Sequence, residues 1–178
     1  YKRQAYGEYK LYHRQPEWSE LNPDEVWKTI ILTIRTSIKE GNIESKSITA
    51  LSTSVLGEAF LPVDKDGNWL YWSMTTFDAR AEKQTKWWEE NFGADEIYQI
   101  TGQPLTSAMP IYTLPKIQWL RENEPEIYRK ASMFLCWEDY VNLRLCGKPV
   151  IDRSVATRTM MFDIRKKRWS DEILSMAK

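Results

Sequence analysis

Histidine and cysteine are scarce in this sequence: His13 is the only histidine, and Cys136 and Cys146 are the only thiols. A protein metal site takes three or four ligands, drawn mainly from such residues, so the chain offers too few to build one around them. We expect both cysteines to be reduced and buried, as in a cytosolic protein. A hydrolase with a nucleophile–base pair usually needs a histidine in its active site. His13, beside Arg14 at a strand end, is instead predicted to lie on the surface.

An excess of either charge is also missing. Lys+Arg and Asp+Glu number 25 each among the 178 residues, so no net field attracts nucleic acid or an anionic membrane, and we expect neither as a partner. No apolar run is long enough to span a bilayer. The glycine-rich dinucleotide motif, the Walker-type phosphate motif and the His-Glu-x-x-His zinc motif do not occur. The sequence therefore carries no self-contained catalytic motif.

Tryptophan, in contrast, is abundant, with nine residues. Indole faces pack against the C–H surfaces of sugars. One hypothesis is therefore a non-catalytic carbohydrate-binding module, in which this chain would bind sugar by itself. Most of the tryptophans, however, occur at helical spacing or beside apolar residues. We therefore expect core packing for Trp27, Trp88, Trp119 and Trp169. Carboxylates are plentiful, but their spacing selects no pair suited to glycosidase chemistry.

The apolar pattern and its breakers predict one α/β domain over residues 1–178, with a mixed sheet flanked by helices and no internal boundary. Asn22 and Pro23 start a helix, Glu25 closes a capping box, and the helix stops at Gly41. The other predicted helices span residues 79–92, 96–101, 114–122, 125–131, 137–145 and 171–177. Strands are predicted at 1–12, 48–55, 59–63 and 69–72, with a glycine-containing turn at 64–67 joining the last two. Residues 152–163 fit either a helix or a strand. Because the first strand begins at the first residue, we expect a fragment whose sheet lacks its earlier strands.

Five segments together resemble a known family. The segment TLPKIQWLREN at 113–123 opens a helix and is similar to a signature of that family. The others occur in the family's order: PEWSELNPDEVW at 16–27, ITALSTS at 48–54, WEDYVNLRLCG at 137–147 and DRSVATRTMMFD at 152–163, followed by Trp169 and Ser170. Cys146 departs from the pattern, since the family usually has threonine there. On these segments the chain is identified as a member of the FGGY carbohydrate kinases, as part of their N-terminal domain.

The resemblance implies a ribonuclease H-like, actin-like ATPase domain and a kinase that transfers the γ-phosphoryl group of ATP to a sugar or polyol hydroxyl. It implies MgATP as the cofactor, bound mainly by parts outside this chain. The family's phosphate loop, Asp-x-Gly-Thr-Thr, does not occur in these residues, and neither does the glycine-rich segment that holds its catalytic aspartate. The fragment alone is therefore expected to be inactive. An inactive member of the same fold is the other alternative. We expect a cytoplasmic protein, and a homodimer is the form considered for it.

The resemblance also places five substrate-binding residues. Gly57 and Glu58 occupy the pair that is Arg-Glu in glycerol kinases and Met-His in xylulokinases. Thr76 stands where the family normally has tryptophan, Asp78 lies in its Trp-Asn-Asp-x-Arg region, and Ile111 replaces a substrate-touching tyrosine of glycerol kinases. A carboxylate at residue 58 suits this role because it accepts hydrogen bonds from two hydroxyls. Gly57 and Ile111 argue against glycerol, which leaves a ketose, polyol or sugar acid, with a xylulokinase-like reaction preferred. Autoinducer-phosphorylating members also resemble the chain, which keeps a non-nutrient substrate open.

Each of these residues also has a structural interpretation. Glu58 would otherwise be an exposed hairpin glutamate, and Asp78 would otherwise cap the helix that follows it. Arg80, Lys116 and Trp119 belong to the family segments as well, but we expect them to be structural.

Overall fold

The computed structural model describes residues 3–177. A five-stranded sheet, in the order β1-β2-β4-β3-β5, lies at its centre, and every pair is antiparallel. Its strands are β1 Leu11–Tyr12, β2 Glu20–Leu21, β3 Phe60–Val63, β4 Ser73–Met74 and β5 Met133–Cys136. The predicted α/β class is confirmed, but the described strands contain no parallel pair, so they do not form the predicted mixed sheet.

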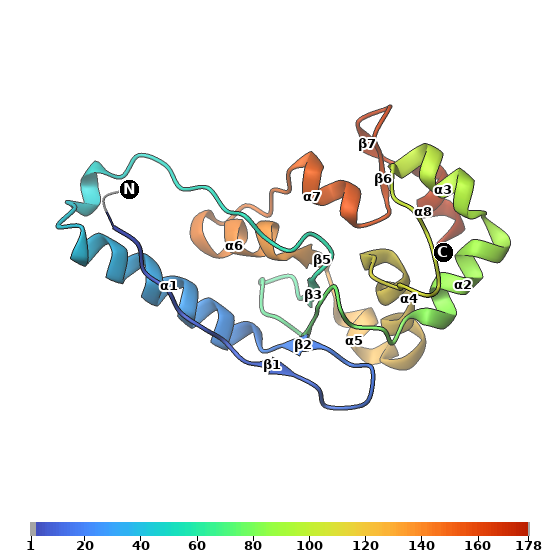
Figure 1. The fold of residues 1–178 in the computed structure, drawn as a ribbon, viewed down its shortest axis with the longest axis horizontal. Coiled ribbons are helices and arrows are strands. Elements are labelled where there is room, and N and C mark those ends of the chain that lie inside the picture. Colours follow the sequence, from blue (N-terminus) through green and yellow to red (C-terminus); the bar gives the residue numbers. More distant parts are fainter. Residues whose placement is uncertain (1–2, 178) are drawn as a thin grey trace.

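The longest helix, α1 (Pro23–Glu40), begins where the sequence predicts. The side chain of Asn22 accepts hydrogen bonds from the backbone N–H groups of Asp24 and Glu25, and Pro23 needs no such partner. The predicted capping box does not form, because the carboxylate of Glu25 accepts instead from the hydroxyl of Tyr12 at 2.6 Å. In Figure 1, α1 lies along one side of the molecule with the N-terminal segment beside it.

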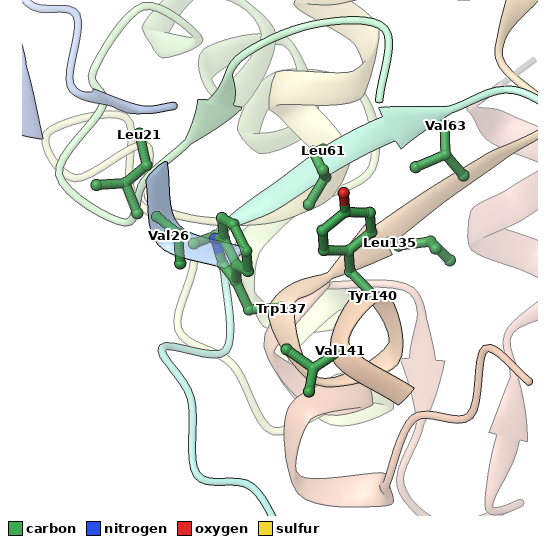
Figure 2. Close-up of a cluster of buried hydrophobic side chains, with 9 residues drawn as sticks. Leu21, Val26, Leu61, Val63, Leu135, Trp137, Tyr140 and Val141 are labelled. Atoms are coloured by element: carbon green, nitrogen blue, oxygen red, sulfur yellow. The ribbon is translucent and has the colours of Figure 1, made fainter. Parts of the chain in front are cut away.

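The first hydrophobic cluster joins the sheet to α6 (Trp137–Cys146). Figure 2 shows Trp137, Tyr140 and Val141 of this helix beside Leu61 of β3 and Leu135 of β5. Strands β3 and β5 are held in register by pairs such as Leu61 with Leu135. These side chains are 0–6% exposed, so the cluster fixes the position of the segment that leads into β3.

The other helices lie at the centre and right of Figure 1, whereas α1 extends to the left. They are α2 Glu82–Asn91, α3 Ala94–Thr101, α4 Thr113–Asn123, α5 Pro125–Lys130, α7 Arg153–Arg158 and α8 Asp171–Met176. Trp88 of α2 and Ile173 of α8 are fully buried in a second cluster with Tyr112. A third cluster around Phe60 and Leu120 links β3 to α4. Comparison of these bounds with the predicted ranges shows that the predicted helices are correct to within a few residues at each end.

One predicted strand is absent from the described residues, and another is much shorter than predicted. Residues 48–55 form no strand, and the only regular element near them is the short 3₁₀ turn at Ser45–Ser47. None of the described residues pairs with this segment as a strand, and Leu51 within it is 52% exposed. The strand predicted at 1–12 shrinks to Leu11–Tyr12; Tyr1 and Lys2 lie outside the described residues. β-branched composition favours a strand, but a strand also needs a neighbour to bond.

The predicted hairpin is correct at its turn and shifted in its second strand. Asp64 accepts from the backbone N–H groups of Asp66 and Asn68, and Gly67 has a φ of +81°, which glycine adopts without strain. Trp69 makes an isolated bridge to Val63, whereas the regular pairing to β3 comes at β4.

Strand β5 was not predicted, since the sequence from residue 95 to 147 is mostly helical in pattern. Its four residues form an apolar run too short to separate from a helix by periodicity. The ambiguous stretch 152–163 divides into α7 and β6 (Phe162–Asp163), and β6 pairs with β7 (Arg168–Trp169). Asp152 caps α7 by accepting from the N–H of Val155 at 2.8 Å.

The tryptophan and cysteine predictions are correct in part. Trp88 is fully buried, and Trp27 packs on the first cluster, but Trp169 is 41% exposed on β7.

Cys136 is buried and Cys146 is exposed at the end of α6; both are free thiols. At the end of α6 the Sγ of Cys146 donates to the backbone carbonyl of Asn142, one turn earlier, at 3.0 Å. His13 is exposed, as predicted. Among the described residues, no helix combines the length and apolarity that crossing a membrane requires.

Candidate functional site

The turn before β3 brings the carboxylate of Glu58 against two other segments. The hydroxyl of Thr76 donates to its Oε2 at 3.0 Å, and the guanidinium of Arg158, at the end of α7, forms an ion pair with its Oε1. The backbone carbonyl of Glu58 accepts from Thr113 at the start of α4, at 3.1 Å. Glu58 is only 3% exposed, so the alternative of an exposed hairpin glutamate is wrong.

Arg158 lies over Gly57. A Cβ atom added at Gly57 would come within 2.7 Å of the Cγ of Arg158, which is closer than such atoms approach. The other end of the guanidinium donates from Nη1 to the side chain of Gln103 at 2.8 Å. Sequence reasoning missed Arg158, although it falls inside the family-like segment 152–163. The signal was weak because Arg158 occupies an unspecified position of that segment, 100 residues from Glu58.

Lys116 links two of the predicted site segments, the one before Thr76 and the one at Ile111, through hydrogen bonds. Its amino group is fully buried and donates to the carbonyl oxygens of Thr75, at 2.5 Å, and Ile111, at 2.8 Å. Burial lowers the pKa of Lys116 to about 7, with Asp78 opposing that shift and Arg80 reinforcing it. The expected structural role of Lys116 agrees with these contacts. The side chain of Ile111 packs against the second hydrophobic cluster.

Asp78 lies in a different environment from Glu58. Its carboxylate accepts from the backbone N–H of Ser19 and from Nε and Nη2 of Arg80, each at 2.7 Å. Arg80 also pairs with Glu20 at 2.7 Å, and its guanidinium lies 3.6 Å from the ring centroid of Trp18. Asp78 is 1% exposed and does not cap α2, whose first flanking residue is Ala81. The helix-cap alternative is therefore wrong, and contact of Asp78 with a substrate stays a prediction.

Two cavities of the described chain lie away from these residues. One, of about 400 Å³, is lined by apolar and polar side chains of α4, by Leu174 of α8, and by Phe134 and Trp169. The other, of about 520 Å³, lies between α2 and α4 beside Lys83 and Trp87. Glu58 and Arg158 line neither. Glu58, Thr76 and Arg158 thus form a polar cluster, which we call the Glu58 cluster, and it belongs to neither cavity.

The described residues offer few groups that could bind a magnesium nucleotide. Among the residues that the structure describes, no three His, Cys, Asp or Glu side chains are grouped so that they could hold a metal ion. The sequence also has no glycine-rich loop of the kind that cradles phosphates. These residues therefore do not fit MgATP as its main binding site.

One buried carboxylate outside the Glu58 cluster is expected to make stability depend on pH. Asp139, in the first turn of α6, is 6% exposed, and its Oδ1 has no hydrogen-bond partner. Burial raises its pKa from the ordinary 3.8 to about 7, so the folded state keeps a proton that the unfolded state loses between those values. The stability that this group contributes is therefore present below pH 3.8 and is lost as the pH rises to 7.

We expect Asp139→Asn to stabilise the protein relative to the parent at pH 8, on the order of 1 kcal/mol or more, and by less at pH 5, because the amide never ionises. Urea unfolding of both proteins at the two pH values measures this difference. Lys116, whose lowered pKa makes stability rise between about pH 7 and 10.5, is present in both proteins and cancels in the comparison. An equal difference at both pH values would show that Asp139 does not titrate in this range.

Solved structures resemble the whole described fold. A protein from Brucella ovis described as a xyloylose kinase superposes with a TM-score of 0.88 at 25% identity, covering 97% of this chain and 34% of that one. The gluconate kinase from Lactobacillus acidophilus gives 0.85 at 23% identity, with 96% and 34% covered, and shows the fold alone. These neighbours have the actin-like ATPase fold, so the predicted fold is confirmed.

Sequence relatives point to the same family. The glycerol kinase of Thermococcus kodakarensis is 31% identical over 173 residues, covering 95% of this chain and 34% of that protein. The xylulose kinase of Bacillus subtilis is 30% identical over 165 residues, with 93% and 32% covered. The chain thus spans about a third of the length of the curated relatives it matches. The family model for the N-terminal domain of the FGGY carbohydrate kinases matches residues 2–178. This chain therefore belongs to the FGGY family of carbohydrate kinases.

Proposed function

We propose that this chain is the sugar-binding part of an ATP-dependent kinase that phosphorylates a hydroxyl of a ketose, polyol or sugar acid. A xylulokinase-like reaction is the preferred form. The observation that carries the proposal is the Glu58 cluster: the residue that the family resemblance assigns to substrate is held by Thr76 and Arg158, from two other segments.

The chemistry of this cluster suits a polyhydroxylated molecule. A carboxylate accepts hydrogen bonds, a guanidinium donates them, and a threonine hydroxyl does both. A substrate hydroxyl is at once a donor and an acceptor, so it needs both kinds of partner. A site built from such groups rejects an analogue that lacks the hydroxyl, because the protein groups are then left unpaired.

The phosphoryl transfer itself belongs to residues outside this chain. MgATP, when bound, supplies the phosphoryl group and neutralises its charge, and a carboxylate must accept the proton of the attacking hydroxyl. The described residues lack a metal cluster and the sequence lacks a phosphate loop. We therefore propose that this chain binds and orients the sugar, and that it turns over no ATP by itself.

The test is a coupled ATP-consumption assay of the full-length protein that contains these residues. The panel should contain ketopentoses, four- to six-carbon polyols, sugar acids and glycerol, and the chain alone should be assayed in parallel. We expect turnover of a ketose or polyol by the full-length protein, weak use of glycerol, and none by the chain alone. A full-length protein that binds sugar but never consumes ATP would overturn the kinase proposal.

A further inference from the structure

Gly57 and Arg158 form a complementary pair in space. Gly57 leaves room that the aliphatic stem of Arg158 fills, since a Cβ at residue 57 would lie 2.7 Å from Arg158 Cγ and 2.9 Å from its Cβ. The φ of Gly57 is not in the left-handed region, so its backbone does not require glycine. The lack of a side chain at residue 57 therefore serves the placement of Arg158.

The two members of the ion pair differ in exposure. The side chain of Glu58 is 4% exposed, whereas that of Arg158 is 39% exposed. Glu58 and Gln103 contact the guanidinium from the protein side and restrict its orientation. A guanidinium has five N–H donors in a fixed plane, so two partners leave donors for a ligand.

The ion pairs of Arg80 provide a comparison, because this arginine is fully enclosed by the protein. The side chain of Arg80 is 1% exposed, and it is enclosed by Asp78, Glu20 and the rings of Trp18 and Trp119. Arg158 has one carboxylate instead of two and presents part of its surface to solvent. Unlike Arg80, Arg158 is therefore not enclosed by its partners, although its guanidinium also lies 5.8 Å from the ring centroid of Tyr112.

We infer that Arg158 is the residue that donates hydrogen bonds to the substrate hydroxyls, with Glu58 as the positioning residue behind it. This rests on the proposed function. The resemblance gives glycerol kinases an arginine at residue 57, next to the glutamate, and here the same group reaches the glutamate from α7. Because the charges of Arg158 and Glu58 cancel, the pair favours neutral vicinal hydroxyls, as in a ketose or polyol, over a sugar acid.

The first test replaces Arg158 in the full-length protein and measures kcat and KM for its best substrate. We expect Arg158→Met to raise KM roughly tenfold to a hundredfold with little change in kcat, because a bond to a non-reacting hydroxyl is present in ground and transition states alike. Arg158→Lys should recover part of this loss. Arg153→Met is the matched control, since Arg153 is exposed at the other end of the same helix.

The second test moves the guanidinium. Gly57→Arg alone should disturb the site, because the new side chain collides with Arg158. The double variant Gly57→Arg/Arg158→Gly removes that collision and should recover most of the loss that Arg158→Gly alone causes, so that KM returns close to the parental value. A double variant no better than Arg158→Gly would count against a guanidinium role, and it would do so even if Arg158→Met failed to fold.

The outcomes separate this inference from the proposed function. If the full-length protein phosphorylates a sugar but Arg158→Met and Arg158→Lys keep the parental KM, the inference is wrong and the proposed function stands. A lower melting temperature of Arg158→Met with an unchanged KM would assign Arg158 a structural role and would also overturn the inference. A sugar acid as the best substrate would contradict its preference for neutral hydroxyls. If no compound on the panel is phosphorylated, both fail together.

Discussion

Replacing Arg80 by alanine is expected to lower the free energy of unfolding by about 3–5 kcal/mol, because the change leaves buried charges without their partner. Arg80 is the cation shared by Asp78 and Glu20, which are 1% and 0% exposed. Burial of an uncompensated carboxylate is costly, so the variant must either admit water or take up a proton. The cation–π contact with Trp18 is lost as well. Urea unfolding followed by tryptophan fluorescence measures the effect.

Arg14→Ala is the matched control. Arg14 pairs with the same Glu20, but its side chain is 39% exposed. Solvent screens this pair, so we expect its loss to cost about 1 kcal/mol or less. Equal costs for Arg14→Ala and Arg80→Ala would mean that the buried network is not held together by Arg80.

The second large effect concerns activity. In the full-length kinase, Glu58→Ala should lower kcat/KM for the best substrate by tens- to hundreds-fold, which corresponds to about 2–4 kcal/mol. The change removes the carboxylate that Thr76 and Arg158 contact, and it leaves the guanidinium without its anchor. Steady-state kinetics of the parent and the variant measure the loss.

Two further variants make this result interpretable. Glu58→Gln keeps the shape of the side chain and one acceptor, so we expect an intermediate loss. Glu172→Ala removes an exposed glutamate of α8 and should leave the kinetics unchanged. An unchanged kcat/KM in Glu58→Ala would rule out Glu58 as part of the substrate site.

The local signals of the sequence were reliable wherever the determining interactions are also local. Asn22 and Pro23 predicted the start of α1, because a cap bonds only to residues two or three positions away. The turn after β3 followed from the side chain of Asp64 and from Gly67 in the same way. The predicted capping box failed because Glu25 has a partner in Tyr12, on another strand.

The strands show the limit of such reasoning. Residues 48–55 have strand composition and yet pair with nothing among the described residues, while β5, which was not predicted, has a partner along its whole length in β3. A strand is stabilised by hydrogen bonds to residues far away in the sequence, and composition does not reveal whether those residues are in place.

The sequence by itself determined most of the helices and the start of α1, and its family segments singled out Glu58, Thr76 and Asp78 as candidate substrate-binding residues. Only the tertiary structure decided that Asp78 lies within a buried ion network, that Lys116 joins the Thr75 and Ile111 segments, and that Arg158 comes to lie on Gly57. The physical reason is sequence separation. Arg158 and Glu58 are 100 positions apart, and only the packing of α7 against the turn before β3 brings a guanidinium to that carboxylate.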